Sequence, residues 1–230
     1  MVLKGDVRMN ERFKLIKPYI ENKTVLDIGC CGWYSRHKEE NIVEGWLHNN
    51  IKKHAKSVLG IDISKECIKF LKEKGYNVEV ANAEDFNLNQ KFDVIVAGEL
   101  IEHLSNFQGF LNSVRKHLKE DGLLILTTPN VFYFKETLFL VLRGYPPVNP
   151  EHTCYFDEVT LRQLLNRFGF SIKKIMYTTE RDACTMYKKC NQETPKLKDV
   201  ILRLTEELIP FKRFKHNTII MIAKKCKGAT

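Results

Sequence analysis

The stretch that decides the fold runs from Thr24 to Cys31 and reads T-V-L-D-I-G-C-C. Its apolar residues end at Gly29, which predicts a short buried strand running into a tight turn. Asp27 places a charge inside this strand, and a buried carboxylate is costly unless a partner hydrogen-bonds to it. An acid and a glycine at the carboxyl end of a strand therefore indicate an edge at which a ligand binds.

Four more apolar runs follow, separated by segments with helical or loop character. The predicted strands cover residues 57–63, 78–81, 92–97 and 123–128, and the predicted helices cover 6–20, 46–56, 64–75 and 107–118. Pro18 predicts that the first helix stops early. Strands that alternate with helices are typical of a parallel α/β sheet, in which ligands bind where the strands end.

The last hundred residues add two strands and a possible cover for that edge. We expect an apolar helix or lid over 131–142, amphipathic helices over 160–168 and 196–209, and strands over 170–178 and 218–223. The total is then seven strands. The two segments 131–156 and 181–216 are the ones expected to lie on the acceptor side.

Composition limits the class of protein. The chain has 230 residues, of which 43 % are hydrophobic and 28 % charged, as in globular proteins, and we expect one domain over residues 1–230. We find neither an apolar run long enough to span a bilayer nor a signal-peptide pattern, so we expect a cytoplasmic protein without a transmembrane segment. The seven cysteines lack any CxxC pair, which supports neither a disulfide framework nor a zinc knuckle.

Positive charge is concentrated near the C-terminus. The net charge is +9, and the last fifty residues contain twelve Lys or Arg against five Asp or Glu. Such a skew suits nucleic acid, an anionic membrane surface or an acidic substrate, although a solvated lysine-rich surface is the simplest interpretation. The segment F-K-R-F-K-H at 211–216 is the most plausible contact for an anion.

A second acid indicates which kind of ligand the edge binds. Asp62 follows the second strand, where a carboxylate can accept both hydroxyls of a ribose. The turn after the first strand reads G-C-C-G-W-Y and lacks the G-x-G-x-x-G pattern that would present amides to pyrophosphate. A nucleoside without a phosphate cradle is therefore expected. Simpler structural roles also exist, because Gly29 could serve a tight turn and Asp62 could cap a helix.

Six motifs occur in order along residues 20–180. They are V-L-D-I-G-C at 25–30, G-I-D-I-S at 60–64, A-N-A-E-D-F at 81–86, F-D-V-I-V-A-G-E-L-I-E-H-L at 92–104, T-T-P-N at 127–130 and E-H-T-C-Y-F at 151–156. In these motifs the sequence resembles class I S-adenosylmethionine-dependent methyltransferases, especially the small-molecule enzymes of ubiquinone biosynthesis. The resemblance implies a Rossmann-like three-layer α/β sandwich with a mostly parallel seven-stranded sheet, whose last strand is antiparallel.

The resemblance also implies a role for each matching position. Asp27 and Gly29 would lie under the methionine part of the cofactor, Asp62 would hold the ribose hydroxyls, Ile63 would pack on the adenine, Asn82, Ala83 and Glu84 would meet the adenine edge, and Ala97, Gly98 and Glu99 would line the floor near the sulfonium. The chain departs from the family at two of its motifs. Cys31 replaces the second glycine of the first motif, and Asn82 replaces the acid that usually precedes Ala-Glu.

The chemistry of methyl transfer points to the segment after the fourth strand. Transfer from a sulfonium is an in-line displacement that needs a positioned acceptor and, for a neutral oxygen or nitrogen, a base. His103 is the best candidate for this base, with a structural histidine as the alternative. The E-x-x-E-H pattern also resembles the metal site of small-RNA 2′-O-methyltransferases and of quinone-biosynthesis O-methyltransferases. Glu99, Glu102 and His103 would then share a helical face and bind a divalent cation with His152.

Three functions follow from these observations. The first is methyl transfer from S-adenosylmethionine to an oxygen or nitrogen of a small molecule, such as a sugar or a quinone-like compound. The second is RNA methylation, which charge and the E-x-x-E-H pattern favour. The third is S-adenosylmethionine binding without catalysis, for which the altered turn at Cys31 is the sequence hint.

Overall fold

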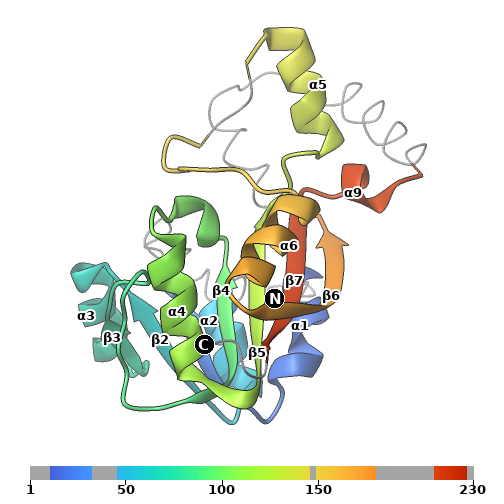
Figure 1. Ribbon diagram of the computed structural model, residues 1–230. Helices are drawn as coiled ribbons and strands as arrows, with labels where there is room; N and C mark the ends of the chain where they lie inside the picture. The colour runs from blue at the N-terminus through green and yellow to red at the C-terminus, as the bar shows by residue number, and fades with distance from the viewer. Residues whose placement is uncertain (1–10, 33–45, 146–148, 180–209, 227–230) are drawn as a thin grey trace, which may run out of the picture.

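The computed structural model describes residues 11–32, 46–145, 149–179 and 210–226. Seven strands form one sheet in the order β3-β2-β1-β4-β5-β7-β6 (Figure 1). The strands are β1 (Thr24–Ile28), β2 (Ser57–Asp62), β3 (Val78–Val80), β4 (Phe92–Gly98), β5 (Leu118–Pro129), β6 (Phe170–Thr178) and β7 (Thr218–Lys225). The pairs among β1 to β5 are parallel, whereas β7 is antiparallel to both β5 and β6. The expected mostly parallel seven-stranded sheet with an antiparallel last strand is confirmed.

Helices cover both faces of this sheet. They are α1 (Glu11–Ile20), α2 (Leu47–His54), α3 (Lys65–Glu73), the 3-10 helix η2 (Ile101–His103), α4 (Phe107–His117), α5 (Phe134–Arg143), α6 (Glu158–Arg167) and the short α9 (Lys212–Lys215). Side chains alternate across a strand, so neighbouring residues of β1 enter different layers. Leu26 packs in the layer with α4 and α6, and Val25 packs in the layer with α1 and α2.

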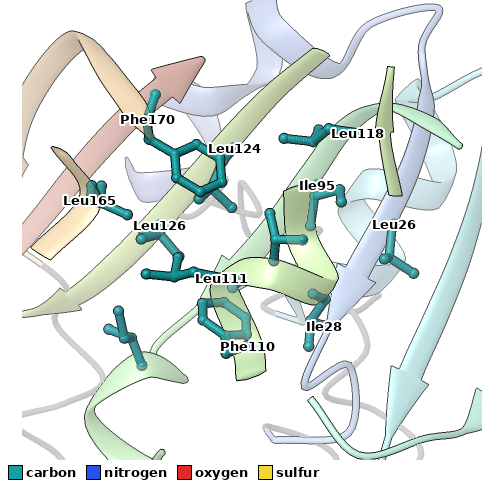
Figure 2. Close-up of a cluster of buried hydrophobic side chains, with 14 of the residues drawn as sticks. Leu26, Ile28, Ile95, Phe110, Leu111, Leu118, Leu124, Leu126, Leu165 and Phe170 are labelled. Carbon is teal, nitrogen blue, oxygen red and sulfur yellow. The ribbon is translucent and has the colours of Figure 1, made fainter. Parts of the chain in front are cut away.

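The larger apolar layer lies between the sheet and helices α4 and α6. Figure 2 shows Phe110 and Leu111 of α4 and Leu165 of α6 with strand residues such as Leu124 and Leu126. These five side chains are fully buried. Each such burial stabilises the fold by roughly 1.5–3 kcal/mol, which fixes the sheet on which the site is built.

Capping residues determine where helices α3 and α6 begin and where α3 ends. The Ser64 side chain accepts a hydrogen bond from the Cys67 amide at 3.3 Å and so begins α3, as its sequence predicts. Gly75 follows α3 with a φ of +78°, a backbone conformation that favours glycine at a helix end. Asp157 begins α6 with a capping box that it completes with Thr160.

Two expectations about element bounds were wrong. Helix α1 continues through Pro18 to Ile20, because a proline this close to the end costs only one hydrogen bond to the preceding turn. Strand β5 begins at Leu118 rather than at residue 123, and its register with β4 shifts between Phe92 and Val94. The predicted helix over 196–209, most of the segment 181–216 and the loop 33–45 lie outside the described residues.

Helices α5 and α9 stand apart from the sandwich. In Figure 1, α5 rises beyond the end of β5, and α9 lies at the same end of the sheet, just before β7. This is the end at which the parallel strands finish. Among the helices that the structure describes, none is long and apolar enough to cross a bilayer.

Candidate active site at the carboxyl edge of the sheet

Register brings three of the predicted site residues into one row. Ile28 pairs with Ile61 on one side and with Ala97 on the other, so the next residues along the three strands are Gly29, Asp62 and Gly98. Parallel strands thus place residues that are far apart in the sequence at one edge, as the sequence predicted.

Gly29 makes the turn after β1 possible. Its φ of +78° lies in the region that favours glycine, and a Cβ there would lie 3.1 Å from the Leu100 side chain. Its amide donates to the Ile61 carbonyl oxygen at 2.8 Å. The turn is therefore fixed to β2, and any larger side chain would strain it.

The backbone is unstrained at Cys31, which stands where similar methyltransferases have the second glycine of the first motif. Of the non-glycine residues that the structure describes, only Asn22 and Glu99 have a positive φ, so Cys31 has a backbone that any residue can adopt. Its amide donates to Asp62 Oδ2 at 2.9 Å, and its thiol is buried. The contact with the Cys30 thiol raises the pKa of Cys31, and burial raises it further, so the thiol stays protonated.

Asp62 uses only part of its acceptor capacity on the protein. Its two oxygens accept from the amides of Cys31 and Ser64, each at 2.9 Å. A carboxylate has about four lone-pair sites, so two remain for a ligand. The adjacent Ile63 side chain is 70 % exposed, which leaves an aliphatic surface open next to this carboxylate.

The loop after β3 has its own internal bonds. Asn82 Oδ1 accepts from the Glu84 amide at 3.0 Å. Glu84 Oε1 in turn accepts from the amides of Asn106 and Ser105, each at 2.7 Å, and these bonds lower the pKa of Glu84. Glu84 therefore has a structural role at the start of α4. Its second oxygen, the half-buried Ala83 and the Asn82 side-chain NH2 group are groups that the loop can offer a ligand.

Asp27 pairs with a residue that the sequence reasoning missed. Its Oδ2 lies 2.9 Å from His48 Nδ1, and the side chains are 3 % and 0 % exposed. Gly60 makes room for this pair, because a Cβ there would lie 2.7 Å from His48 Cε1. The charge inside β1 signalled that a buried partner exists, but no spacing rule identifies His48 as that partner.

Glu99 is held on the α1 side of the sheet. It has a φ of +52° and follows β4 directly. Its Oε1 accepts from Thr127 Oγ1 at 2.9 Å and lies 3.5 Å from Arg12 Nη1. The expected helical face shared with Glu102 and His103 does not form, because η2 begins only at Ile101 and Glu99 lies before it.

Glu102, His103 and His152 come together beyond the end of β4. Each offers one ligand atom, and these atoms lie within 4.8 Å of one another. The rings of His103 and His152 meet edge to face with centroids 4.7 Å apart. The His103 Nδ1 lies 3.1 Å from the Glu151 carbonyl oxygen, which can only accept, so the ring proton is on Nδ1 and the Nε2 lone pair is left.

Glu102 is the buried member of this group. It is 1 % exposed; its Oε2 accepts from Thr128 Oγ1 at 3.0 Å, and its Oε1 has no hydrogen-bond partner among the described residues. Burial raises the pKa of Glu102 well above its ordinary value, and the neighbouring Glu99 carboxylate raises it further. The Thr153 amide donates to the Glu102 carbonyl oxygen at 2.8 Å, so the segment that carries His152 is fastened to η2.

Comparison with known proteins identifies the family. A family model described as a methyltransferase domain matches residues 9–175, about three quarters of the chain. The chain belongs to this methyltransferase domain family. With its sheet and motif order, it is an S-adenosylmethionine-dependent methyltransferase, and S-adenosylmethionine is its methyl donor.

Similar proteins include enzymes of quinone biosynthesis. The chain is 26 % identical to a ubiquinone biosynthesis O-methyltransferase of Hydrogenovibrio crunogenus over 71 % of this chain and 69 % of that protein. It is 32 % identical to one of Pelagibacter ubique, over 48 % of this chain but only 44 % of that protein. A crystal structure of a methyltransferase from Archaeoglobus fulgidus has the same fold, with a TM-score of 0.56, 22 % identity and coverage of 93 % and 91 % of the two chains.

Proposed function

We propose that this methyltransferase transfers the methyl group to a hydroxyl oxygen of a small quinone-like molecule. The observation that carries this proposal is the group of Glu102, His103 and His152 at the edge where the strands end. The named activity of the two ubiquinone-biosynthesis relatives supports an oxygen acceptor. When bound, S-adenosylmethionine supplies an electrophilic methyl group on a positively charged sulfur.

The residues at the strand ends fit this methyl donor. The two remaining lone-pair sites of Asp62 match the two hydroxyls of a ribose, and the exposed Ile63 side chain offers an apolar face to adenine. Asp27, Gly29, Asn82, Ala83, Ala97 and Gly98 would complete the pocket. Glu84 and Glu99 would act mainly by fixing the loops on which these residues lie.

His103 has the geometry of a base. The Glu151 carbonyl oxygen fixes the tautomer, so the Nε2 lone pair of the neutral ring can take the proton of an acceptor hydroxyl. Positioning of the acceptor then supplies most of the remaining rate enhancement.

A divalent cation also fits the group. One carboxylate and two imidazoles suit a metal such as Mn²⁺ or Zn²⁺. The buried Oε1 of Glu102 has no hydrogen-bond partner among the described residues, and the carboxyl would lose its proton when it ligates the metal. Such a cation would orient vicinal hydroxyls of the acceptor. Glu102, His103 and His152 would hold it, whereas Glu99 is bonded to Arg12 and Thr127.

Activity and binding assays separate these roles. On a panel of catechols and hydroquinones, His103→Ala should lower turnover by about 10²- to 10⁴-fold while calorimetry shows unchanged S-adenosylmethionine affinity. Asp62→Ala should instead weaken cofactor binding by about 10- to 100-fold. His54→Ala on α2 is the matched control. Turnover of His103→Ala equal to wild type would exclude the base.

Chelation and an RNA substrate test the alternatives. If a cation is required, EDTA abolishes turnover and Mn²⁺ restores it in wild type, but not in His152→Ala. If the acceptor is RNA, methyl incorporation into a short RNA exceeds that into every small phenol and falls steeply with salt. Cofactor binding without turnover on any of these acceptors would favour a binding protein.

A further inference from the structure

Three thiols lie together beside the turn that follows β1. Cys30 and Cys31 come directly after Gly29, and Cys67 lies in the first turn of α3. All three belong to one buried cluster and are 3 %, 1 % and 8 % exposed. The Cys31 thiol makes hydrogen-bonding contacts with the thiols of both Cys30 and Cys67. The cysteine that departs from the family motif is therefore the one that connects the other two.

The Asp62 carboxylate lies next to these thiols. One ligand atom each from Cys30, Cys31 and Asp62 lies within 4.8 Å of the other two. The ligand atoms of a tetrahedral zinc site are about 3.3–3.8 Å apart, because its bonds are about 2.0–2.3 Å long. Side-chain movements of about 1 Å would therefore bring two sulfurs and one oxygen to a common metal ion.

Contacts with β2 hold these donors in place. The Cys31 amide donates to Asp62 Oδ2 at 2.9 Å, and the Cys30 amide donates to the Ile61 carbonyl oxygen at 3.2 Å. Gly60 leaves room for the Cys30 thiol, because a Cβ there would lie 2.8 Å from its sulfur. The donors are thus positioned by the strand before any ligand arrives, as a metal site requires.

Thiol ligands determine which cations suit the cluster. Mg²⁺ and Ca²⁺ prefer oxygen ligands, whereas Zn²⁺ binds thiolates as well as carboxylates. Each thiol that ligates the metal releases its proton to water, and the negative charge of the thiolates and of Asp62 then favours the cation. Buried cysteines also occur simply as small apolar side chains. Here, however, a carboxylate lies within ligand distance of two thiols, which apolar packing would not require.

We propose that Cys30, Cys31 and Asp62 bind Zn²⁺ or a similar thiol-binding cation, with Cys67 as a further thiol ligand, and that this cation competes with the cofactor. The lone-pair sites of Asp62 that the metal would take are those that match the ribose hydroxyls. Metal and S-adenosylmethionine therefore exclude each other, and each weakens the binding of the other by the same factor. The competition rests on the proposed role of Asp62 in the cofactor pocket, whereas the binding of the metal does not.

Titration of the full chain with Co²⁺ tests the metal site, because Co²⁺ replaces Zn²⁺ in thiolate sites and gives them a charge-transfer band in the near ultraviolet. With a phosphine present to keep the thiols reduced, wild type should develop this band, and an equimolar amount of Zn²⁺ should remove it. Cys31→Gly, which restores the family residue, should weaken Co²⁺ binding by at least about 100-fold, since it removes the thiol that connects the other two. Cys67→Ser should weaken it by about tenfold or more.

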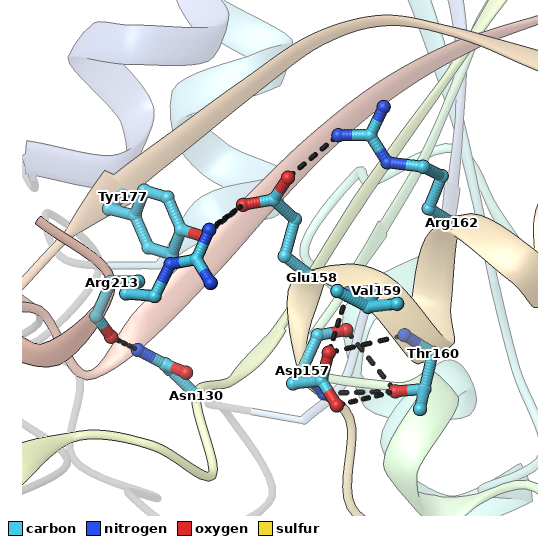
Figure 3. A network of polar contacts seen from close by, with 8 residues as sticks. All are labelled: Asn130, Asp157, Glu158, Val159, Thr160, Arg162, Tyr177 and Arg213. Carbon is cyan, nitrogen blue, oxygen red and sulfur yellow. Dashed lines mark hydrogen bonds and ion pairs between the residues drawn. The ribbon is translucent and has the colours of Figure 1, made fainter.

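Three control variants keep all the proposed ligands. Cys226→Ser removes an exposed thiol just after β7. His152→Ala alters the other candidate metal group, whose three residues offer only nitrogen and oxygen ligands. Arg162→Ala removes the 2.7 Å ion pair with Glu158 on α6, which packs on β6 at the edge of the sheet opposite β3 (Figure 3). Each should show the thiolate band with the affinity of wild type, and thermal unfolding verifies that every variant folds.

Calorimetry with S-adenosylhomocysteine then tests the competition. Saturating Zn²⁺ should weaken its binding to wild type by at least about tenfold, and should not change its binding to Cys31→Gly. Absence of the band from wild type, or a band of equal affinity in Cys31→Gly, would overturn the metal site. Bound Zn²⁺ with an unchanged affinity for S-adenosylhomocysteine would overturn the competition. Neither measurement uses a methyl acceptor, so an error in the proposed acceptor would leave both results unaffected.

Discussion

At the scale of single residues, Asp27 has a buried partner that its motif does not name. The family motif assigns it to the methionine part of the cofactor, and the structure gives its Oδ2 a buried contact with His48 at 2.9 Å. His48 is contributed by α2, packs against Trp46 with ring centroids 5.2 Å apart, and is fully buried. The pair joins β1 to α2, so Asp27 ties the strand that leads into Gly29 to the neighbouring helix.

Removal of this carboxylate tests the role directly. Asp27→Ala leaves the His48 ring buried without its partner and should lower the free energy of unfolding by about 3–5 kcal/mol, as measured by urea denaturation. Asp27→Asn keeps an acceptor at the same place and should lose less than half as much. Asp85→Ala, an exposed acid, is the control. An unchanged urea midpoint for Asp27→Ala would show that the pair contributes nothing to stability.

At the scale of elements, the position of α4 depends on a glycine. Gly109 lies in the first turn, where a Cβ would lie 2.2 Å from the Glu84 carbonyl oxygen and 2.6 Å from Asn106 Nδ2. The helix therefore packs directly on the loop after β3. The Glu84 carboxylate completes this junction by accepting from the amides of Ser105 and Asn106.

Helix propensity and packing predict opposite effects of Gly109→Ala on stability. In an exposed helix, Gly→Ala stabilises by about 1 kcal/mol. Here the added methyl group must displace backbone, so Gly109→Ala should destabilise by about 1–3 kcal/mol in thermal unfolding. Gly32→Ala, whose Cβ would have the Gly29 carbonyl oxygen at 3.6 Å as its neighbour among the described residues, should stay near the wild-type Tm. A rise in Tm for Gly109→Ala would show that α4 can shift away from the loop after β3 and make room for the methyl group.

At the scale of the whole molecule, one carboxylate joins three strands. Asp93 on β4 accepts from Thr24 Oγ1 and the Thr24 amide at 2.6 and 2.9 Å, and from Lys119 Nζ at 2.8 Å. Burial alone would raise the pKa of Asp93, but the hydrogen bonds from Lys119 and Thr24 outweigh it and lower that pKa well below its ordinary value. The carboxylate form is therefore the one that the fold stabilises.

This lowered pKa predicts acid sensitivity with a definite sign. The unfolded chain binds a proton on Asp93 near an ordinary pKa of about 3.9, above the folded value, so stability rises with pH. The contribution should be complete above about pH 5 and disappear progressively as the pH falls through 4 and below. Asp93→Asn should flatten the change of urea midpoint between pH 6 and pH 3. A midpoint of wild type that does not fall with acidification would contradict this.

Much of the fold was predictable because its signals are local. Apolar runs placed all seven strands, and caps such as Ser64 and Gly75 placed helix ends within one or two residues. The motif order then gave the strand-end row of Gly29, Asp62 and Gly98. Residues such as His48 and Arg12 escaped prediction, because their roles depend on contacts with partners 21 and 115 residues away.

The sequence by itself determined the sheet, the family and the edge at which the cofactor is expected, since periodicity and motif order are properties of the chain. Only the tertiary structure decided which partners the side chains of the site have and where its backbone is strained. It showed Asp27 held by His48, Cys31 free of backbone strain, and Glu99 paired with Arg12 and bonded to Thr127. A side chain's partner is set by which elements pack together, and that packing is decided by the whole core rather than by any one motif.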